Sequence, residues 1–136
     1  MIFLDRYEDI LVIGATAKSQ TTVNQKNTAR AIHSGSIDVF STPMMIALME
    51  SAAYECIQPH LPDGVTSLGI TVNIEHTAGS PIDASIEATA VITGISGRRV
   101  EFDVYATSST GGSVKEIGRG KHTRAIVTIE KFLSKL

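Results

Sequence analysis

The stretch Pro43-Met-Met-Ile-Ala-Leu-Met-Glu-Ser-Ala-Ala-Tyr-Glu-Cys-Ile57 decides the fold, because it predicts a helix that is apolar almost all the way round. At about 100° per residue, Ser51, Glu55 and Gln58 fall in one narrow polar stripe, which does not include Glu50. A helix with so little polar surface needs cover on more than one side. We therefore expect a sheet that wraps around this helix, or a second subunit packed against it.

Both ends of the helix are marked in the sequence. Thr42 can serve as the N-cap, and Pro43 suits the first helical position because the N–H that it lacks would have no partner there. Pro59 and the turn Pro62-Asp-Gly64 cannot continue a helix, which predicts an end near Gln58.

Apolar and polar residues alternate with a period of two before and after the helix, which predicts β-strands. The predicted strands span residues 10–17, 68–76, 82–92, 100–106 and 125–129. Turns that contain glycine separate most of the later strands, which favours hairpins and an antiparallel sheet. We therefore expect one α+β domain over residues 1–136, with about five antiparallel strands against one long helix.

A long polar segment, Gln20 to Phe40, joins the first strand to the helix. It has room for one short helical turn at residues 28–33. Loops of this length inside compact domains are often lids or binding segments. We expect this segment to cover a binding site and to set the size of the bound group.

Composition excludes several classes of function. The 136 residues carry a net charge of −2 with acids and bases well mixed, which argues against a nucleic-acid-binding surface. No run of 18 apolar residues is present, and the first residues lack the pattern of a signal peptide, so we expect neither a membrane span nor export. Cys56 is the only cysteine, which rules out an intrachain disulfide and fits a cytoplasmic location.

Glu50 is the first candidate for a functional group. Its neighbours on the helix surface are mostly apolar, where a carboxylate is costly unless another group pairs with it. Two interpretations follow from this pattern. Glu50 is either a buried acid held by backbone donors or an interface partner, or a general base or nucleophile tuned by burial and a nearby imidazole.

His76 is a source of that imidazole. It ends the predicted strand of residues 68–76, and alternation places it in phase with Leu68, Ile70, Val72 and Ile74. The turn that follows puts it at the rim of the sheet, within reach of a ligand. A structural histidine at a strand end is the alternative, but two titratable groups directed into apolar layers indicate a chemical site.

Thr42 is the third candidate. Helix capping accounts for it fully, but a hydroxyl at a helix N-terminus also lies where free N–H groups stabilise a developing oxyanion. Eight helical residues span about 12 Å, so we do not expect Thr42 and Glu50 of one chain to touch. Either His76 lies between them, or a dimer brings together residues from two chains.

Other chemistry has no support in the sequence. His33, His60 and His122 show no metal-ligand spacing with Cys56. Glycine-rich phosphate loops and the Gly-x-Ser-x-Gly nucleophile motif are absent. We therefore expect neither a metal nor a cofactor.

Four segments together resemble the fluoroacetyl-CoA thioesterase-like branch of the hotdog superfamily, with a likeness that extends from about residue 9 to 133. They are Val39-Phe-Ser-Thr-Pro-Met-Met-Ile-Ala-Leu-Met-Glu50, Ser67-Leu-Gly-Ile-Thr-Val-Asn-Ile-Glu-His-Thr-Ala78, Gly97-Arg-Arg99 and Ile117-Gly-Arg-Gly-Lys-His-Thr-Arg124. The resemblance implies a hotdog fold, in which a curved antiparallel sheet wraps a long helix. It also implies a homodimer, alone or within a larger assembly, with sites at the subunit interface.

The resemblance implies hydrolysis of a small acyl-CoA thioester without a metal or cofactor. It assigns catalysis to Thr42, Glu50 and His76, and substrate contact to Gly69 and Arg124. We add His76 and Phe40 to the substrate-contacting candidates. The alternative is a non-catalytic hotdog dimer that binds acyl-CoA or another small acyl ligand.

One segment departs from the family pattern. The characterised fluoroacetyl-specific enzyme carries aromatic residues in the lid before the helix, whereas the matching Ile32-His-Ser-Gly-Ser-Ile37 has none, and the next aromatic residue is Phe40. The resemblance therefore implies thioester chemistry and leaves the acyl group open.

Overall fold

The computed structural model describes residues 6–136 of the domain predicted over 1–136. The first five residues, which include most of the N-terminal segment in which we looked for a signal peptide, lie outside the described residues. The main elements, in chain order, are β1 (Thr16–Thr22), α1 (Thr42–Ile57), β2 (Val65–His76), β3 (Ser85–Ser96), β4 (Arg99–Thr110), β5 (Ser113–Thr128) and α2 (Ile129–Leu133). Short 3-10 turns lie at Tyr7–Asp9 and Gln58–His60.

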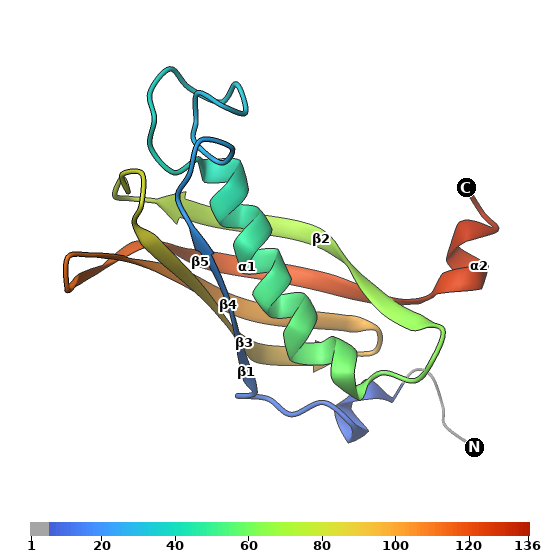
Figure 1. Ribbon diagram of the computed structural model, residues 1–136. Coiled ribbons are helices and arrows are strands. Elements are labelled where there is room, and N and C mark those ends of the chain that lie inside the picture. The colour runs from blue at the N-terminus through green and yellow to red at the C-terminus, as the bar shows by residue number, and fades with distance from the viewer. Residues whose placement is uncertain (1–5) are drawn as a thin grey trace.

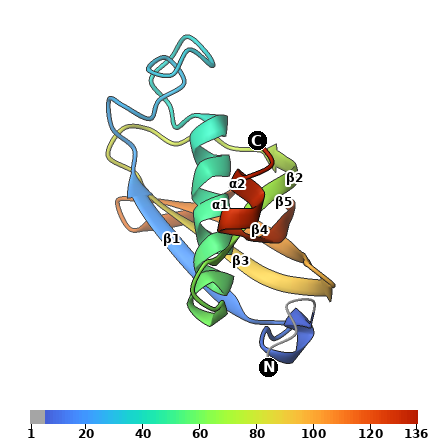
Figure 2. The ribbon, with the colours of Figure 1, turned by 90° about the vertical axis from the view of Figure 1, so that its right-hand side faces the viewer.

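The five strands form one antiparallel sheet in the order β1-β3-β4-β5-β2. Helix α1 lies across one face of this sheet, and the long segment before it folds over the end where α1 begins (Figure 1, Figure 2). The predicted class, five antiparallel strands against one long helix, is confirmed. Among the described residues, no helix has the length and apolar character needed to cross a membrane.

The start of α1 differs by one residue from the prediction. Ser41, not Thr42, is the N-cap: its backbone is extended, and its side-chain oxygen accepts a hydrogen bond from the Met44 N–H at 3.3 Å. Thr42 is the first helical residue and Pro43 the second. Serine and threonine cap almost equally well, so the pattern could not decide between them. As a consequence, the hydroxyl of Thr42 is not used for capping.

The first strand was predicted too early in the chain. Only Thr16 and Ala17 of the predicted residues 10–17 belong to it. Strand β1 begins at Thr16, after Gly14, whose φ of +92° interrupts an extended chain. The strand that does form has a polar sequence, since it lies at a sheet edge with one side exposed. Ile129, predicted to belong to the last strand, is instead the first residue of α2.

A β-bulge changes the direction of side chains along β2. Gly69 pairs with Arg124, Thr71 pairs with Thr123, and the register shifts between them. The one-residue insertion exchanges the two faces of the strand. Leu68 therefore does not lie on the same face as Ile74 and His76, contrary to the predicted alternation, and Gly69 does.

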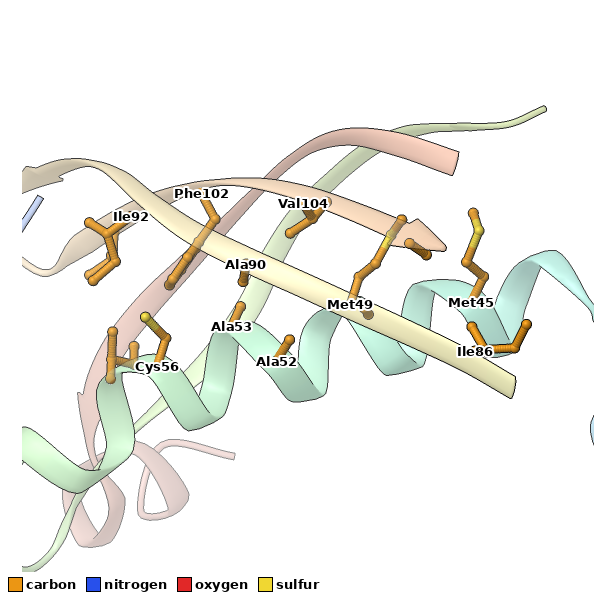
Figure 3. Close-up of a cluster of buried hydrophobic side chains, with 14 of the residues drawn as sticks. Met45, Met49, Ala52, Ala53, Cys56, Ile86, Ala90, Ile92, Phe102 and Val104 are labelled. Atoms are coloured by element: carbon orange, nitrogen blue, oxygen red, sulfur yellow. The ribbon is translucent and has the colours of Figure 1, made fainter. Parts of the chain in front are cut away.

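The core lies between α1 and the middle strands. Met45, Met49, Ala52, Ala53 and Cys56 of α1 point toward the sheet, where residues of β3 and β4 meet them (Figure 3). The small alanines allow close approach of helix and sheet, and the methionines fill irregular space. The helix surface on the side of Glu50 is not covered as completely, since Ile46, Glu50 and Tyr54 are only partly buried.

Ile86→Ala tests this core. Ile86 of β3 is 0% exposed, so the substitution should remove about 2–5 kcal/mol from the free energy of unfolding. Val114→Ala is the control, because Val114 is 64% exposed and its truncation should change stability little. Urea denaturation of the two variants measures the difference, and equal effects would contradict the assignment of the core.

Candidate active site

Thr42 and His76 meet at the end of the sheet where α1 begins. The first helical residue and the last residue of β2 bring Thr42 Oγ1 within 2.7 Å of His76 Nδ1. The sequence predicted both residues as candidates but not their direct contact. The bulge in β2 makes the contact, because it turns His76 toward the helix side of the sheet.

A cavity of about 290 Å³ opens beside this pair. It is lined by Ala29, Ser34, Val39, Phe40, Ser41, Thr42, His76, Thr77, Ala78 and Gly79. The long segment before α1 contributes Ala29, Ser34, Val39 and Phe40 and so lines part of the cavity. Phe40 is the aromatic residue that this segment adds to the cavity lining, and it is almost fully buried.

The environment of His76 favours the neutral ring. Burial lowers the pKa of His76 from its ordinary value of 6.5, and the nearby backbone of Ala78 opposes that shift to a smaller extent. Its Nε2 atom is buried without a hydrogen bond. The ring is therefore ready to accept a proton at neutral pH.

Glu50 lies in a second cluster, near the middle of α1. Its Oε2 is 3.5 Å from Nη1 of Arg124, whose side chain is only 7% exposed, whereas the Glu50 side chain is 39% exposed. Glu50 is thus partly open in the single chain rather than fully buried. It is paired with a guanidinium and not with the imidazole of His76.

Arg124 is held almost entirely by protein groups. Its Nε donates to Ser67 Oγ at 2.8 Å, and its Nη2 donates to the Ser67 carbonyl at 3.0 Å. Nη1 lies 3.2 Å from Nε2 of His122, which is itself buried. Ser67 and His122 were not predicted from the sequence. The bulge hides that Ser67 shares a face with Gly69 and His76, and the only signal for His122 is its place two residues before Arg124.

Gly69 completes this cluster because a larger residue would displace the Glu50 carboxylate from its position. A Cβ atom at this position would collide with Glu50 Oε2 and approach His122 Cε1 to 3.1 Å. The absence of a side chain at Gly69 therefore lets the carboxylate lie directly against β2.

The two clusters are separated within one chain. Thr42 marks one and Glu50 the other, and eight helical residues place them about 12 Å apart along α1. In one chain, therefore, the predicted acid does not reach the threonine–histidine pair. Within residues 6–136, no three His, Cys, Asp or Glu side chains gather closely enough to hold a metal ion.

The helix N-terminus offers few free donors. Ser41 caps the Met44 N–H with its side chain and the Met45 N–H with its carbonyl, and Pro43 has no N–H. The Thr42 N–H is the first-turn donor that Ser41 does not cap. An oxyanion at this end of α1 would depend on that group and on donors from elsewhere.

Comparisons with known proteins agree on one family. The family model for fluoroacetyl-CoA-specific thioesterases matches residues 23–130. The chain belongs to this family. A curated relative, the fluoroacetyl-CoA thioesterase of Streptantibioticus cattleyicolor, is 37% identical over 99 residues, which cover 73% of this chain and 68% of the relative.

Solved structures extend the likeness to the fold. A threonine-to-serine variant of the fluoroacetyl-CoA enzyme, in complex with acetyl-CoA, is 30% identical with a TM-score of 0.82, covering 92% of this chain and 96% of that one. A thioesterase superfamily member from Thermus thermophilus is 25% identical with a TM-score of 0.83, covering 92% and 90%. The predicted hotdog fold is confirmed, and the chain is a thioester hydrolase, as predicted.

Gly69→Ala should reduce hydrolysis strongly while leaving the fold intact. The added methyl group collides with the flexible end of Glu50, so the carboxylate moves while the backbone stays in place. Gly94→Ala is a matched control: Gly94 also lies at a register shift in a strand, and its added Cβ would meet a flexible glutamate end, Glu101 Oε2 at 2.7 Å, away from the cavity. Thiol release and thermal unfolding should separate the two variants. Equal activity would contradict the importance of the Glu50 position.

The pH dependence of hydrolysis should report the state of His76. Because its pKa lies below 6.5, the ring is neutral at pH 7 and becomes protonated only as the pH falls below 6.5. We expect kcat/KM to be level near neutral pH and to decline on the acid side, with a midpoint below 6.5. A decline centred above 6.5 would contradict the neutral ring.

Proposed function

We propose that the protein is an acyl-CoA thioesterase that hydrolyses small acyl thioesters with Thr42, His76 and Glu50 as its catalytic groups. The observation that carries this proposal is the 2.7 Å contact between Thr42 Oγ1 and His76 Nδ1 beside a cavity under the lid. An hydroxyl paired with a neutral imidazole is the arrangement that activates an oxygen nucleophile. The acetyl-CoA complex of the related enzyme supports coenzyme A as the carrier.

The tautomer of His76 follows from this role. With its proton on Nε2, the ring accepts from the Thr42 hydroxyl at Nδ1. Thr42 Oγ1 then attacks the thioester carbonyl carbon, its proton passes to Nδ1, and the carbon–sulfur bond breaks as the thiolate leaves. His76 returns that proton to the thiolate, and water hydrolyses the acyl-threonine to the carboxylic acid.

A direct route uses the same residues without an acyl-enzyme. Glu50 removes a proton from water as the water attacks the carbonyl carbon. That proton passes to the neutral ring of His76, which delivers it to the thiolate as the carbon–sulfur bond breaks. Single-turnover hydrolysis in ¹⁸O-labelled water, followed by mass analysis of the protein and the acid, distinguishes the routes. A mass increase of the protein by the acyl group supports the covalent route through Thr42 or Glu50.

A homodimer would bring Glu50 to the threonine–histidine pair. Strand β2 lies at an edge of the sheet, and Leu68, Ile70 and Val72 along it are 41%, 43% and 41% exposed. A long edge strand with exposed apolar side chains favours pairing with another strand. Antiparallel pairing of two copies of β2 carries the His76 end of one copy toward the Gly69 region of the other. We propose that each site combines Thr42 and His76 of one subunit with Glu50 of the partner subunit.

Gly69 and Arg124 have supporting roles in this site. Gly69 contacts the substrate next to Glu50. Arg124 is buried, so it acts through Glu50 rather than by direct contact with the substrate. The lid segment sets the acyl size. A free thiol at Cys56 and a coenzyme A substrate fit a reducing cytoplasm.

Mixing two inactive variants tests the shared site. His76→Ala and Glu50→Gln should each abolish most thiol release from short acyl-CoA substrates. In a mixed dimer, one site combines an intact Thr42–His76 pair with an intact Glu50, so activity should return at one site of two. Light scattering should give the mass of a dimer or a multiple of it.

The same mixture also separates the alternatives. A site contained within one chain leaves both halves of the mixed dimer inactive, so no recovery would refute the shared site. Full hydrolysis by Glu50→Gln would remove Glu50 from the mechanism. Tight binding of acyl-CoA by the wild-type protein without thiol release would refute the thioesterase.

A further inference from the structure

The imidazole of His122 takes no part in the proposed reaction, yet it touches the arginine that faces Glu50. His122 is 2% exposed and lies on the helix side of β5, two residues before Arg124. Its ring stacks on Phe102 with centroids 6.0 Å apart and an interplanar angle of 26°. A polar ring in such a place needs a partner for each nitrogen.

The arginine fixes the tautomer of this ring. A guanidinium has donors only and stays charged, so the 3.2 Å contact with Arg124 Nη1 requires an unprotonated Nε2 on His122. The ring proton then lies on Nδ1, which donates to the Thr71 carbonyl at 2.8 Å. Thr71 belongs to the bulge of β2. The neutral ring therefore connects the bulge to the guanidinium.

The position of Arg124 depends on this connection. Ser67 accepts hydrogen bonds from Nε and Nη2 of Arg124. The distance from Nη1 to Glu50 Oε2, 3.5 Å, is long for a hydrogen bond. His122 is the hydrogen-bond acceptor that orients Nη1. Without it, a buried donor would lack a partner and the guanidinium would turn.

We propose that His122 is a positioning residue, protonated on Nδ1, which ties the β2 bulge to Arg124 and so holds the guanidinium beside Glu50. This proposal rests on the function proposed above for Glu50. The charged groups that face His122 are Arg124 and Glu50. Burial and Arg124 lower its pKa, the Thr71 backbone and Glu50 oppose the shift, and the balance favours the neutral ring.

Two substitutions distinguish positioning from packing. His122→Phe keeps a flat ring against Phe102 but offers no acceptor, whereas His122→Gln places an amide oxygen within reach of Arg124. We expect kcat/KM for the folded enzyme to fall about tenfold or more in the Phe variant and to recover largely in the Gln variant. His60→Phe is the control, because His60 is exposed. A packing role predicts the reverse order, with Phe better tolerated than Gln, and that order would overturn the proposal.

A second background tests whether His122 acts through Arg124. In Arg124→Met, Nε2 of His122 has no guanidinium to accept a hydrogen bond from. Adding His122→Phe to this variant should therefore change kcat/KM little further. An equally large further loss would show that His122 acts independently of Arg124, against the proposal.

An NMR measurement separates this proposal from the proposed function. Two-dimensional ¹H–¹⁵N spectra of the His rings, assigned with His122→Gln, should show His122 neutral and protonated on Nδ1 at pH 7. A proton on Nε2, or on both nitrogens, would overturn the proposal even if the enzyme is active. The Nδ1 tautomer in a protein that hydrolyses no acyl-CoA would leave the geometry standing and refute the thioesterase alone.

Discussion

The bulge between Gly69 and Thr71 is the constraint on which both clusters depend. Without it, a strand of period two could not present both Gly69 and His76 to the helix, because their residue numbers differ by an odd number, seven. The inserted residue lets one strand place a glycine against Glu50 and a histidine against Thr42. The same bulge supplies the Thr71 carbonyl that holds His122. A local irregularity in one edge strand thus places His76 beside Thr42, Gly69 beside Glu50 and the Thr71 carbonyl beside His122.

The spacing of the two clusters explains why one chain is not a complete site. Thr42 and Glu50 lie on the same helix, about 12 Å apart, and a straight helix cannot shorten that distance. Two copies of an edge strand, related by a two-fold axis, can bring Thr42 of one subunit near Glu50 of the partner subunit. The partly exposed apolar surface along β2 and around Ile46 of α1 is on the side where this would happen. Dimerisation and catalysis are therefore coupled in the proposed function.

The sequence predicted the parts of the fold that rest on burial. The apolar helix, its end near Gln58 and the later hairpins follow from periodicity and turn residues, because helix and sheet bury one face each. Most of strand β1 was missed because an edge strand with one solvent-exposed face does not need apolar alternation. The bulge escaped because an inserted residue leaves no mark in a pattern that is apolar on both sides of it. Ser67 was missed for the same reason, since the bulge decides which residues share its face. His122 was missed because its partners, Thr71 on another strand and Arg124 on its own, cannot be read from the spacing of histidines and cysteines.

Arg124 shows why stability alone does not account for this cluster. A guanidinium taken out of water loses hydration that one carboxylate at 3.5 Å repays poorly, and buried ion pairs are often no better than apolar residues of the same size. The surrounding hydrogen bonds offset that cost rather than create a surplus. A leucine or methionine in this place would satisfy the fold. An apolar residue could not hold a positive charge next to the partly exposed carboxylate of Glu50. Such a fixed charge has its effect on the reaction rather than on the stability of the fold.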